Sequence, residues 1–200
     1  MSVAATVETD PVVVDDGEFK SQMVALIPSL RAFARSLCGN PDMADDLAQE
    51  AMARAWKARG SFTMGTNFRA WMFMILRNIF YTTIRKNSRM TSWDPEIAER
   101  VLVEPATQHV GIELNDVQKA LDKLPPVQRE MLMLVAAEGV SYEEAAMIAG
   151  CAIGTVKSRV ARARAALVLL LEGQEIDNAG EDQDARKAQL PAGFGFAELS

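Results

Sequence analysis

The stretch VSYEEAAMIAGCAIGTVKSRVARARAALVLLL, residues 140–171, decides the fold of the C-terminal half of the chain. Ser141 is followed three residues later by Glu144, which is the spacing of a capping box, so we expect a helix to begin there. Gly150 can adopt the left-handed conformation that ends many helices. A second helix follows within about four residues, the short turn that a helix-turn-helix needs.

The second helix of this stretch has two different sides when it is placed on a wheel of 3.6 residues per turn. The apolar stripe, which must face the protein, consists of Val156, Val160, Ala163 and Leu167. The residues away from this stripe carry hydroxyl or basic groups: Thr155, Lys157, Ser158, Arg159, Arg162 and Arg164. Small residues permit close approach to the major groove, while lysine and arginine reach guanine edges and phosphates. A solvated basic helix in an ordinary bundle is the alternative, but the cap, the turn glycine and the phase of the stripe together favour DNA binding.

The formal net charge of −6 is unevenly distributed along the chain. Residues 1–19 hold five acidic residues and no basic one, and residues 172–200 hold seven acidic and two basic residues. Residues 20–171 therefore carry 19 basic and 15 acidic residues, so the body of the protein is basic. We predict that residues 1–19 and 172–200 are acidic, disordered tails.

Several functional classes are disfavoured by composition. Cys38 and Cys151 are far apart and the chain has one histidine, so we predict no metal site and no cofactor. Neither a signal peptide nor an apolar run long enough to cross a bilayer is present, which predicts a cytoplasmic protein with no membrane contact. No Cys/His pair or phosphate-binding loop points to an enzyme.

Residues 20–91 form a first predicted helical module. Apolar periodicity predicts a helix over residues 20–38, where Pro28 marks either a kink or the true start. Asn40 and Pro41 predict a new helix that runs to about residue 59. One side of this helix is polar and mostly acidic, and it includes Asp46, Gln49 and Glu50. Composition alone favours a solvated surface there over a docking face.

Residues 51–93 hold eight basic residues, no acidic residue and eight of the thirteen aromatic residues of the chain. Cations that follow phosphates and rings that stack on bases are typical of proteins that bind single strands. The alternative is core packing, and we assign at least half of the rings to a core. A loop at residues 61–67 interrupts the stretch, and the helix after it, residues 68–86, is apolar on more than one side. That helix is either sandwiched or presents a binding surface.

Residues 92–113 are acidic and contain Pro95 and Pro105, which predicts a flexible linker. Residues 114–171 form the second helical module. No segment shows the alternation of a strand, so the fold class is predicted to be all-α, with two small helical domains joined by the linker.

The order of these motifs resembles that of the extracytoplasmic-function (ECF) sigma factors, and most closely the EcfG-type general stress response group. In the second module the resemblance lies in LPPVQREMLML at 124–134, SYEEAAMIAG at 141–150 and GTVKSRVARARAAL at 154–167. In the first it lies in DDLAQEAMARAWKA at 45–58 and SFTMGTNFRAWMFMILRN at 61–78. The resemblance implies a sigma-2-like domain at 20–91 and a sigma-4-like domain at 114–171.

The resemblance also implies roles for individual residues. Asp46, Gln49 and Glu50 would dock onto the clamp helices of the largest subunit of core RNA polymerase. The loop with Ser61, Phe62 and Asn67 would capture a flipped base of the minus-ten element. Four residues after it would hold the opened strand: Arg77, Asn78, Arg85 and Lys86. At the minus-thirty-five element, Lys157, Ser158 and Arg162 would meet bases, and Thr155, Arg159 and Arg164 would meet mainly phosphates.

A NepR-type anti-sigma factor is the implied inhibitor of this predicted promoter-recognition protein. The sequence departs from the family where Ala152 replaces a frequent proline and where Ala161 is too small for a larger base contact. Two other functions stay open at this point. One is a conventional helix-turn-helix regulator, and the other is a sigma mimic that binds only an anti-sigma factor.

Overall fold

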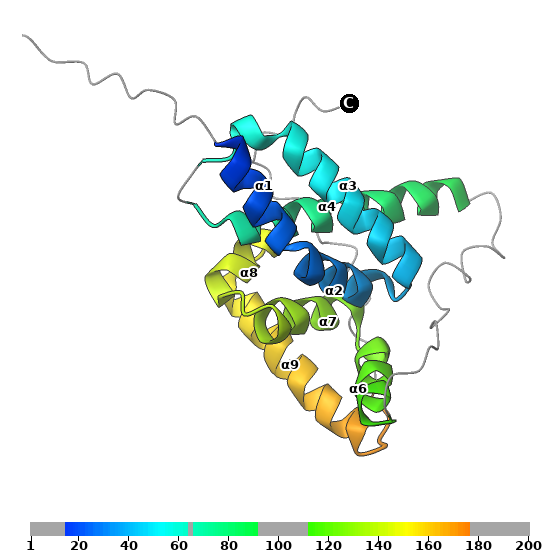
Figure 1. Ribbon diagram of the computed structural model, residues 1–200. Coiled ribbons are helices and arrows are strands. Elements are labelled where there is room, and N and C mark those ends of the chain that lie inside the picture. The colour runs from blue at the N-terminus through cyan, green and yellow to red at the C-terminus, as the bar shows by residue number, and fades with distance from the viewer. Residues whose placement is uncertain (1–14, 64–65, 92–111, 177–200) are drawn as a thin grey trace, which may run out of the picture.

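A computed structural model describes residues 15–63, 66–91 and 112–176 of the chain. Within these ranges the chain is helical and contains no β-strand (Figure 1). The predicted all-α class is confirmed. Residues 1–14, 92–111 and 177–200, which include most of the predicted tails and linker, lie outside the described residues.

The first module contains α1 (Asp16–Ala25), α2 (Ile27–Cys38), α3 (Pro41–Lys57), a short 3-10 turn (Arg59–Ser61) and α4 (Phe68–Thr91). Pro28 lies in the first turn of α2, and α1 ends at Ala25. Of the two possibilities for Pro28, the structure therefore selects a helix start, because the missing N–H of proline removes no hydrogen bond in a first turn.

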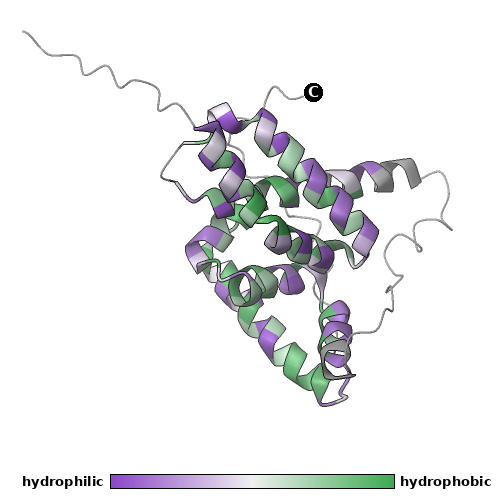
Figure 2. Ribbon diagram, viewed as in Figure 1, coloured by the Kyte–Doolittle hydropathy of each residue, from purple (hydrophilic) through white to green (hydrophobic). Residues whose placement is uncertain are grey.

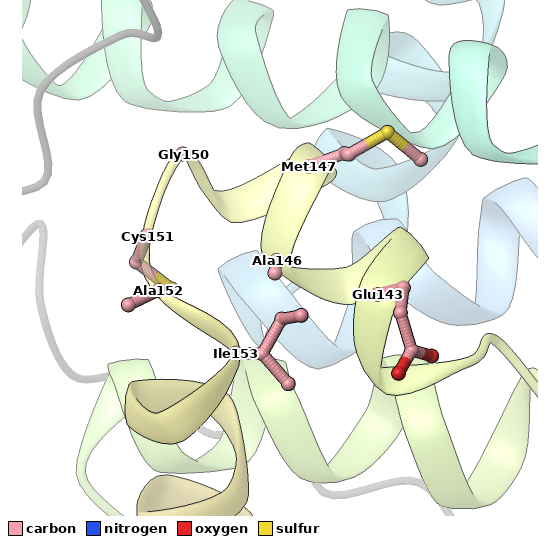
Figure 3. A pocket seen from close by; sticks show the side chains of 7 residues that line it. All are labelled: Glu143, Ala146, Met147, Gly150, Cys151, Ala152 and Ile153. Atoms are coloured by element: carbon pink, nitrogen blue, oxygen red, sulfur yellow. The ribbon is translucent and has the colours of Figure 1, made fainter.

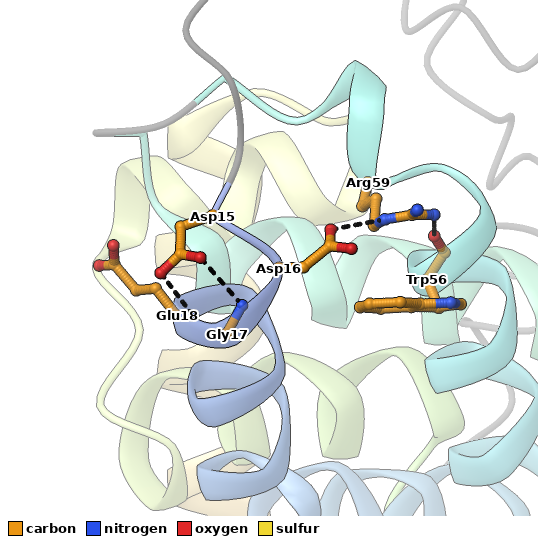
Figure 4. A network of polar contacts seen from close by, with 6 residues as sticks. All are labelled: Asp15, Asp16, Gly17, Glu18, Trp56 and Arg59. Atoms are coloured by element: carbon orange, nitrogen blue, oxygen red, sulfur yellow. Dashed lines mark hydrogen bonds and ion pairs between the residues drawn. The ribbon is translucent and has the colours of Figure 1, made fainter.

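The N-terminal tail is shorter than predicted, because α1 begins inside it. Asp15 caps α1 by accepting hydrogen bonds from the backbone N–H groups of Gly17 and Glu18, each at 3.2 Å (Figure 4). Phe19 is only 1% exposed and is surrounded by rings. The prediction of disorder through residue 19 is wrong for its last residues, because burial of one large ring and a capped first turn stabilise the helix.

Helix α4 is the centre of the first module. It contacts α2 and α3 of its own module and α8 (Tyr142–Ala149) of the second. Phe73 meets Phe33 of α2 edge-on, with ring centroids 5.1 Å apart. The hydropathy colouring shows the first part of α4 as apolar and interior, whereas its later part projects from the body and is more polar (Figure 2). Packing thus explains why α4 is apolar on several sides. Of the two predicted possibilities, a sandwiched helix or a binding surface, the structure shows the sandwiched helix.

The second module contains α6 (Ile112–Lys123), α7 (Pro126–Leu132), a π-helical turn (Met133–Ala137), α8 and α9 (Ile153–Leu171). Helix α9 contacts α6, α7 and α8. Beyond α9 the chain turns back, since the N–H of Gln174 donates to the carbonyl of Leu169 at 2.9 Å and half-buried Ile176 packs on the core around Leu124. The first five residues of the predicted C-terminal tail are therefore ordered against the second module.

The two modules touch. Helix α2 contacts α7, and α4 contacts α8, so that residues of both modules belong to one hydrophobic core (Figure 1). Met131, Leu134 and Ile148 of the second module belong to the same cluster as the first-module rings, and each is fully buried.

Candidate nucleic-acid and polymerase interfaces

The helix-turn-helix is built as its sequence predicts. The side chain of Ser141 accepts a hydrogen bond from the N–H of Glu144 at 3.1 Å, and the Glu144 carboxylate accepts from the N–H of Ser141 at 2.9 Å. Gly150 ends α8 with φ of 65°. Three residues later α9 begins, and Ala152 at its N-cap supplies no side-chain hydrogen bond. The turn therefore sets the direction of α9 relative to α8.

Helix α9 presents the predicted residues on its outer side. Val156, Val160 and Ala163 are buried, so this part of the predicted stripe is confirmed. Lys157, Ser158, Arg162 and Arg164 are exposed, while Thr155 and Arg159 are half-buried. A guanidinium nitrogen of Arg162 lies 3.4 Å from the hydroxyl of Ser158. No acidic residue occurs in α9, so its exposed side is a cationic surface that runs along the helix.

A shallow hollow of about 620 Å³ lies beside the turn, between α8 and the start of α9 (Figure 3). Met147, 52% exposed, and Ile153, 40% exposed, give it an apolar lining. Cys151 also lines it, and burial raises the pKa of the Cys151 thiol, which disfavours the reactive thiolate.

Helix α3 places the predicted polymerase-docking residues in solvent. Asp46, Gln49 and Glu50 are all exposed, and they lie opposite a buried face of small residues and Leu47. Glu50 forms an ion pair with Arg54 at 2.7 Å, one turn further on. The three side chains thus form a polar, mostly acidic surface that a large partner could reach.

The predicted base-capturing loop is anchored at both ends. Ser61 donates to the carbonyl of Ala58 at 2.7 Å, and Asn67 caps α4 by accepting from the N–H of Ala70 at 2.9 Å. Residues 64 and 65 lie outside the described residues. Ser61 and Asn67 are exposed, but Phe62 is 7% exposed.

Phe62 belongs to a cluster of rings with Phe19, Phe68 and Trp71, with centroids 5.0–6.2 Å apart. Beside the cluster Arg59 stacks over Trp56 at 4.3 Å and pairs with Asp16 at 2.9 Å (Figure 4). In this conformation the ring of Phe62 packs inside the protein and is not accessible to a nucleic-acid strand.

The predicted strand-holding residues of α4 divide into two kinds. Arg85 and Lys86, near the end of the helix, are exposed. Asn78 is half-buried, and its Oδ1 has no hydrogen-bond donor among the described residues. Arg77 is 2% exposed and pairs with Glu130 of α7, which is fully buried. Arg77 therefore reaches a strand only after the second module has moved away.

The buried ion pair is joined by the hydroxyl of Tyr81, which donates to Glu130 at 2.8 Å. Burial lowers the pKa of the Arg77 guanidinium, but the Coulomb attraction of Glu130 outweighs it and the net pKa is raised. Burial and the nearby Glu130 carboxylate also raise the pKa of Tyr81 far above its usual value. Both donors thus keep their protons at physiological pH.

Sequence reasoning missed Glu130, Tyr81 and the contact between Arg69 and Glu138. The sequence did offer a signal for Arg77 of the Arg77–Glu130 pair, because this residue is a lone charge within an apolar part of α4. A buried charge requires a partner. The partner could not be read, since it lies in the other module.

The part of the chain that the structure describes holds neither a membrane-spanning helix nor a metal-binding cluster. No helix there is long and apolar enough to cross a membrane. No group of three or more metal-ligating side chains gathers within the same residues.

Comparison with known proteins assigns both modules. Residues 23–90 match the model of Sigma-70 region 2, and residues 114–167 match that of Sigma-70, region 4. The ECF RNA polymerase sigma factor EcfG of Rhodopseudomonas palustris (strain TIE-1) is 47% identical over 168 residues, covering 84% of this chain and 92% of the relative. The chain belongs to the ECF RNA polymerase sigma factors. Its predicted family is thereby confirmed.

Other relatives of this sigma factor agree. The Bacillus subtilis factor SigW is 32% identical over 66% of this chain and 76% of its own length. The sigma factor RpoE of Bartonella quintana, solved in complex with the anti-sigma factor NepR, has a TM-score of 0.70 and 44% identity over 79% of this chain and 99% of that one. CnrH, solved with the cytosolic domain of CnrY, has a TM-score of 0.60 and 28% identity, covering 81% of this chain and 92% of that one.

Proposed function

We propose that this sigma factor directs core RNA polymerase to promoters of a general stress response and that a NepR-type anti-sigma factor restrains it. Similarity to EcfG supports the stress-response role, and similarity to the RpoE that was solved with NepR supports the inhibitor. The observation that carries the proposal is that one chain presents two exposed faces for two macromolecules, the outer side of α9 for duplex DNA and the outer side of α3 for polymerase.

Promoter recognition begins at α9 in this proposal. Lys157, Ser158 and Arg162 read bases of the minus-thirty-five element, because all three are exposed. The long side chains of Lys157 and Arg162 reach groove edges, and the small Ser158 lets the helix approach closely enough for its hydroxyl to contact a base. Thr155, Arg159 and Arg164 lie beside them and bind mainly phosphates, which position a helix without reading sequence.

Promoter opening belongs to the first module. The loop with Ser61, Phe62 and Asn67 captures an unstacked base, and Arg77, Asn78, Arg85 and Lys86 bind the backbone of the opened strand. Phe62 and Arg77 are buried in the closed protein. Arg77 is buried against Glu130, so its role includes a rearrangement in which the second module leaves α4 before the strand is bound. Phe62 is buried among rings of its own module, so its role includes a local movement of the loop out of that cluster.

Polymerase binding belongs to α3, where Asp46, Gln49 and Glu50 dock onto the clamp helices of the largest subunit. The sigma factor supplies recognition and strand opening while the polymerase supplies catalysis, so the chain is not an enzyme by itself, and it works in the cytoplasm where the polymerase works.

Both other candidate functions lose support. A conventional helix-turn-helix regulator leaves the first module, with its Sigma-70 region 2 match, without a role. A mimic that binds only an anti-sigma factor has no need of a cationic α9, and Lys157 and Arg164 are exposed there.

The test is transcription reconstituted from purified core polymerase, this sigma factor and a stress promoter. We expect run-off product from the matched promoter, little from a promoter with scrambled elements, and loss of product when a NepR-type protein is added. Equal product from both promoters would overturn the promoter role, and unchanged product with the NepR-type protein would overturn the proposed restraint.

A further inference from the structure

Three side chains at the start and middle of α4 each meet a carboxylate of the second module. Asn67, at the N-cap, donates to Glu144 of α8. Arg69 pairs with Glu138, which follows the π-helical turn, at 2.5 Å. Arg77 pairs with Glu130 of α7. These three residues define what we call the α4 polar row, which extends about 15 Å at 1.5 Å per residue.

We propose that the α4 polar row has two alternative partners: the three carboxylates in the closed protein, and phosphates of the opened promoter strand when the modules separate. This inference rests on the proposed function, since it takes the opened strand as the ligand of the first module. It adds that the second module inhibits strand binding by occupying the phosphate positions, and it adds Arg69 to the strand-binding residues.

The sequence around the row leaves its cations dependent on an outside anion. Residues 51–93 contain no aspartate and no glutamate. An anion for Arg69 or Arg77 therefore comes from another part of the chain or from another molecule. Carboxylates and phosphates are the two groups that guanidinium binds with paired, charge-assisted hydrogen bonds, so one can replace the other at the same side chain.

Burial makes the two partners mutually exclusive. Arg77 is 2% exposed and Glu130 is fully buried, so a phosphate cannot reach this pair while the modules are in contact. The side chain of Arg69 is 38% exposed, and there the carboxylate of Glu138 occupies the guanidinium that a phosphate would bind. A buried ion pair also contributes little net stability, because the loss of hydration offsets most of the attraction. The Arg77–Glu130 pair is therefore specific in its geometry and adds little to the apolar packing that holds the modules together, so that Arg77 can exchange its carboxylate for a phosphate once that packing opens.

The experiment measures strand binding without polymerase. Glu130→Gln removes the buried carboxylate charge, and the double variant Glu138→Gln with Glu144→Gln removes the two nearer the surface while glutamine still serves the capping box. Glu143→Gln is the matched control, because Glu143 is an exposed acid of α8 that forms no ion pair with the described residues of α4. Readouts are the affinity for a labelled single-stranded minus-ten oligonucleotide and the radius of gyration by X-ray scattering.

We expect Glu130→Gln and the double variant to expand the protein and to bind the oligonucleotide about tenfold more tightly than Glu143→Gln, since affinity scales with the fraction of open protein. Adding Arg69→Gln to Glu130→Gln should reverse most of the gain, whereas adding Lys57→Gln, on α3, should reverse little of it. Where Glu130→Gln fails to fold, as judged by circular dichroism, the double variant decides.

Strand affinity equal to that of Glu143→Gln, in compact or expanded protein, would overturn the inference. Loss of the gain with Lys57→Gln as much as with Arg69→Gln would overturn the assignment of the α4 polar row. The proposed function fails separately, when wild-type protein with core polymerase gives no promoter selectivity, because that assay does not depend on how the free protein is closed.

Discussion

In the proposed function, Arg162 is the residue of α9 on which base reading depends most clearly. It is exposed, lies one turn after Ser158 and contacts its hydroxyl at 3.4 Å, so its guanidinium projects from the same side as the predicted base-reading residues. If the guanidinium binds a guanine edge, its removal deletes two hydrogen bonds between the protein and the DNA.

We therefore expect Arg162→Ala to weaken initiation by about 1–3 kcal/mol at a matched minus-thirty-five element. Run-off transcription from matched and scrambled upstream elements measures this. Equal loss on both templates would show a phosphate contact in place of a base contact.

Phe19 illustrates how one residue changes an element. It was assigned to a tail because its neighbours are acidic, yet its ring is buried against Phe68 at a centroid distance of 5.0 Å. We expect Phe19→Ala to lower the free energy of unfolding by about 3–5 kcal/mol. Urea denaturation measures this, with Val24→Ala as the control, because Val24 lies on the same helix and is 60% exposed. Similar midpoints for the two variants would place Phe19 outside the core.

Helices were the elements that the sequence predicted best. The capping box, Gly150 and the stripe of α9 are local signals, and each was confirmed because neighbouring residues alone determine it. The start of α1 was missed for the opposite reason, since the ring that stabilises it packs on residues more than forty positions away. The exposed surface of α3 was visible in the sequence as polarity, but the docking role proposed for it came from family resemblance.

Helix α3 gives a prediction about polymerase. We expect Gln49→Ala with Glu50→Ala to weaken binding of core polymerase by about tenfold, or about 1.4 kcal/mol, and to leave the fold intact, because both side chains are exposed. Asp116→Ala with Gln118→Ala, on the exposed side of α6, is the control. Pull-down of core enzyme at wild-type strength by the α3 variant would remove the docking role.

The whole molecule unites two modules that the sequence separates. The acidic, proline-containing segment between them leaves open whether they touch, and no local pattern could show that α2 packs on α7 or that Arg77 pairs with Glu130. These contacts join residues that are fifty or more positions apart in the chain, and a single sequence does not encode such pairs visibly. The closed arrangement also buries Arg77, one of the predicted promoter-opening residues, so the placement of the modules bears directly on the proposed function.

A shared core makes a prediction about cooperativity. Leu134 is fully buried in the cluster that contains rings of the first module, whereas residues 114–171 contain no tryptophan. We expect Leu134→Ala to lower the unfolding free energy by about 2–5 kcal/mol and to shift the transition that Trp56 and Trp71 fluorescence reports. A shift in circular dichroism alone, with tryptophan fluorescence at its wild-type midpoint, would show that the modules unfold independently.

The position of Phe19 has a practical consequence for anyone who shortens this protein. The Sigma-70 region 2 match begins at residue 23, so a recombinant version trimmed to that boundary omits the capped first turn of α1 and its ring. Phe62, Phe68 and Trp71 would then face water over a single apolar surface, which favours self-association. Versions meant to stay monomeric should therefore begin before Asp15.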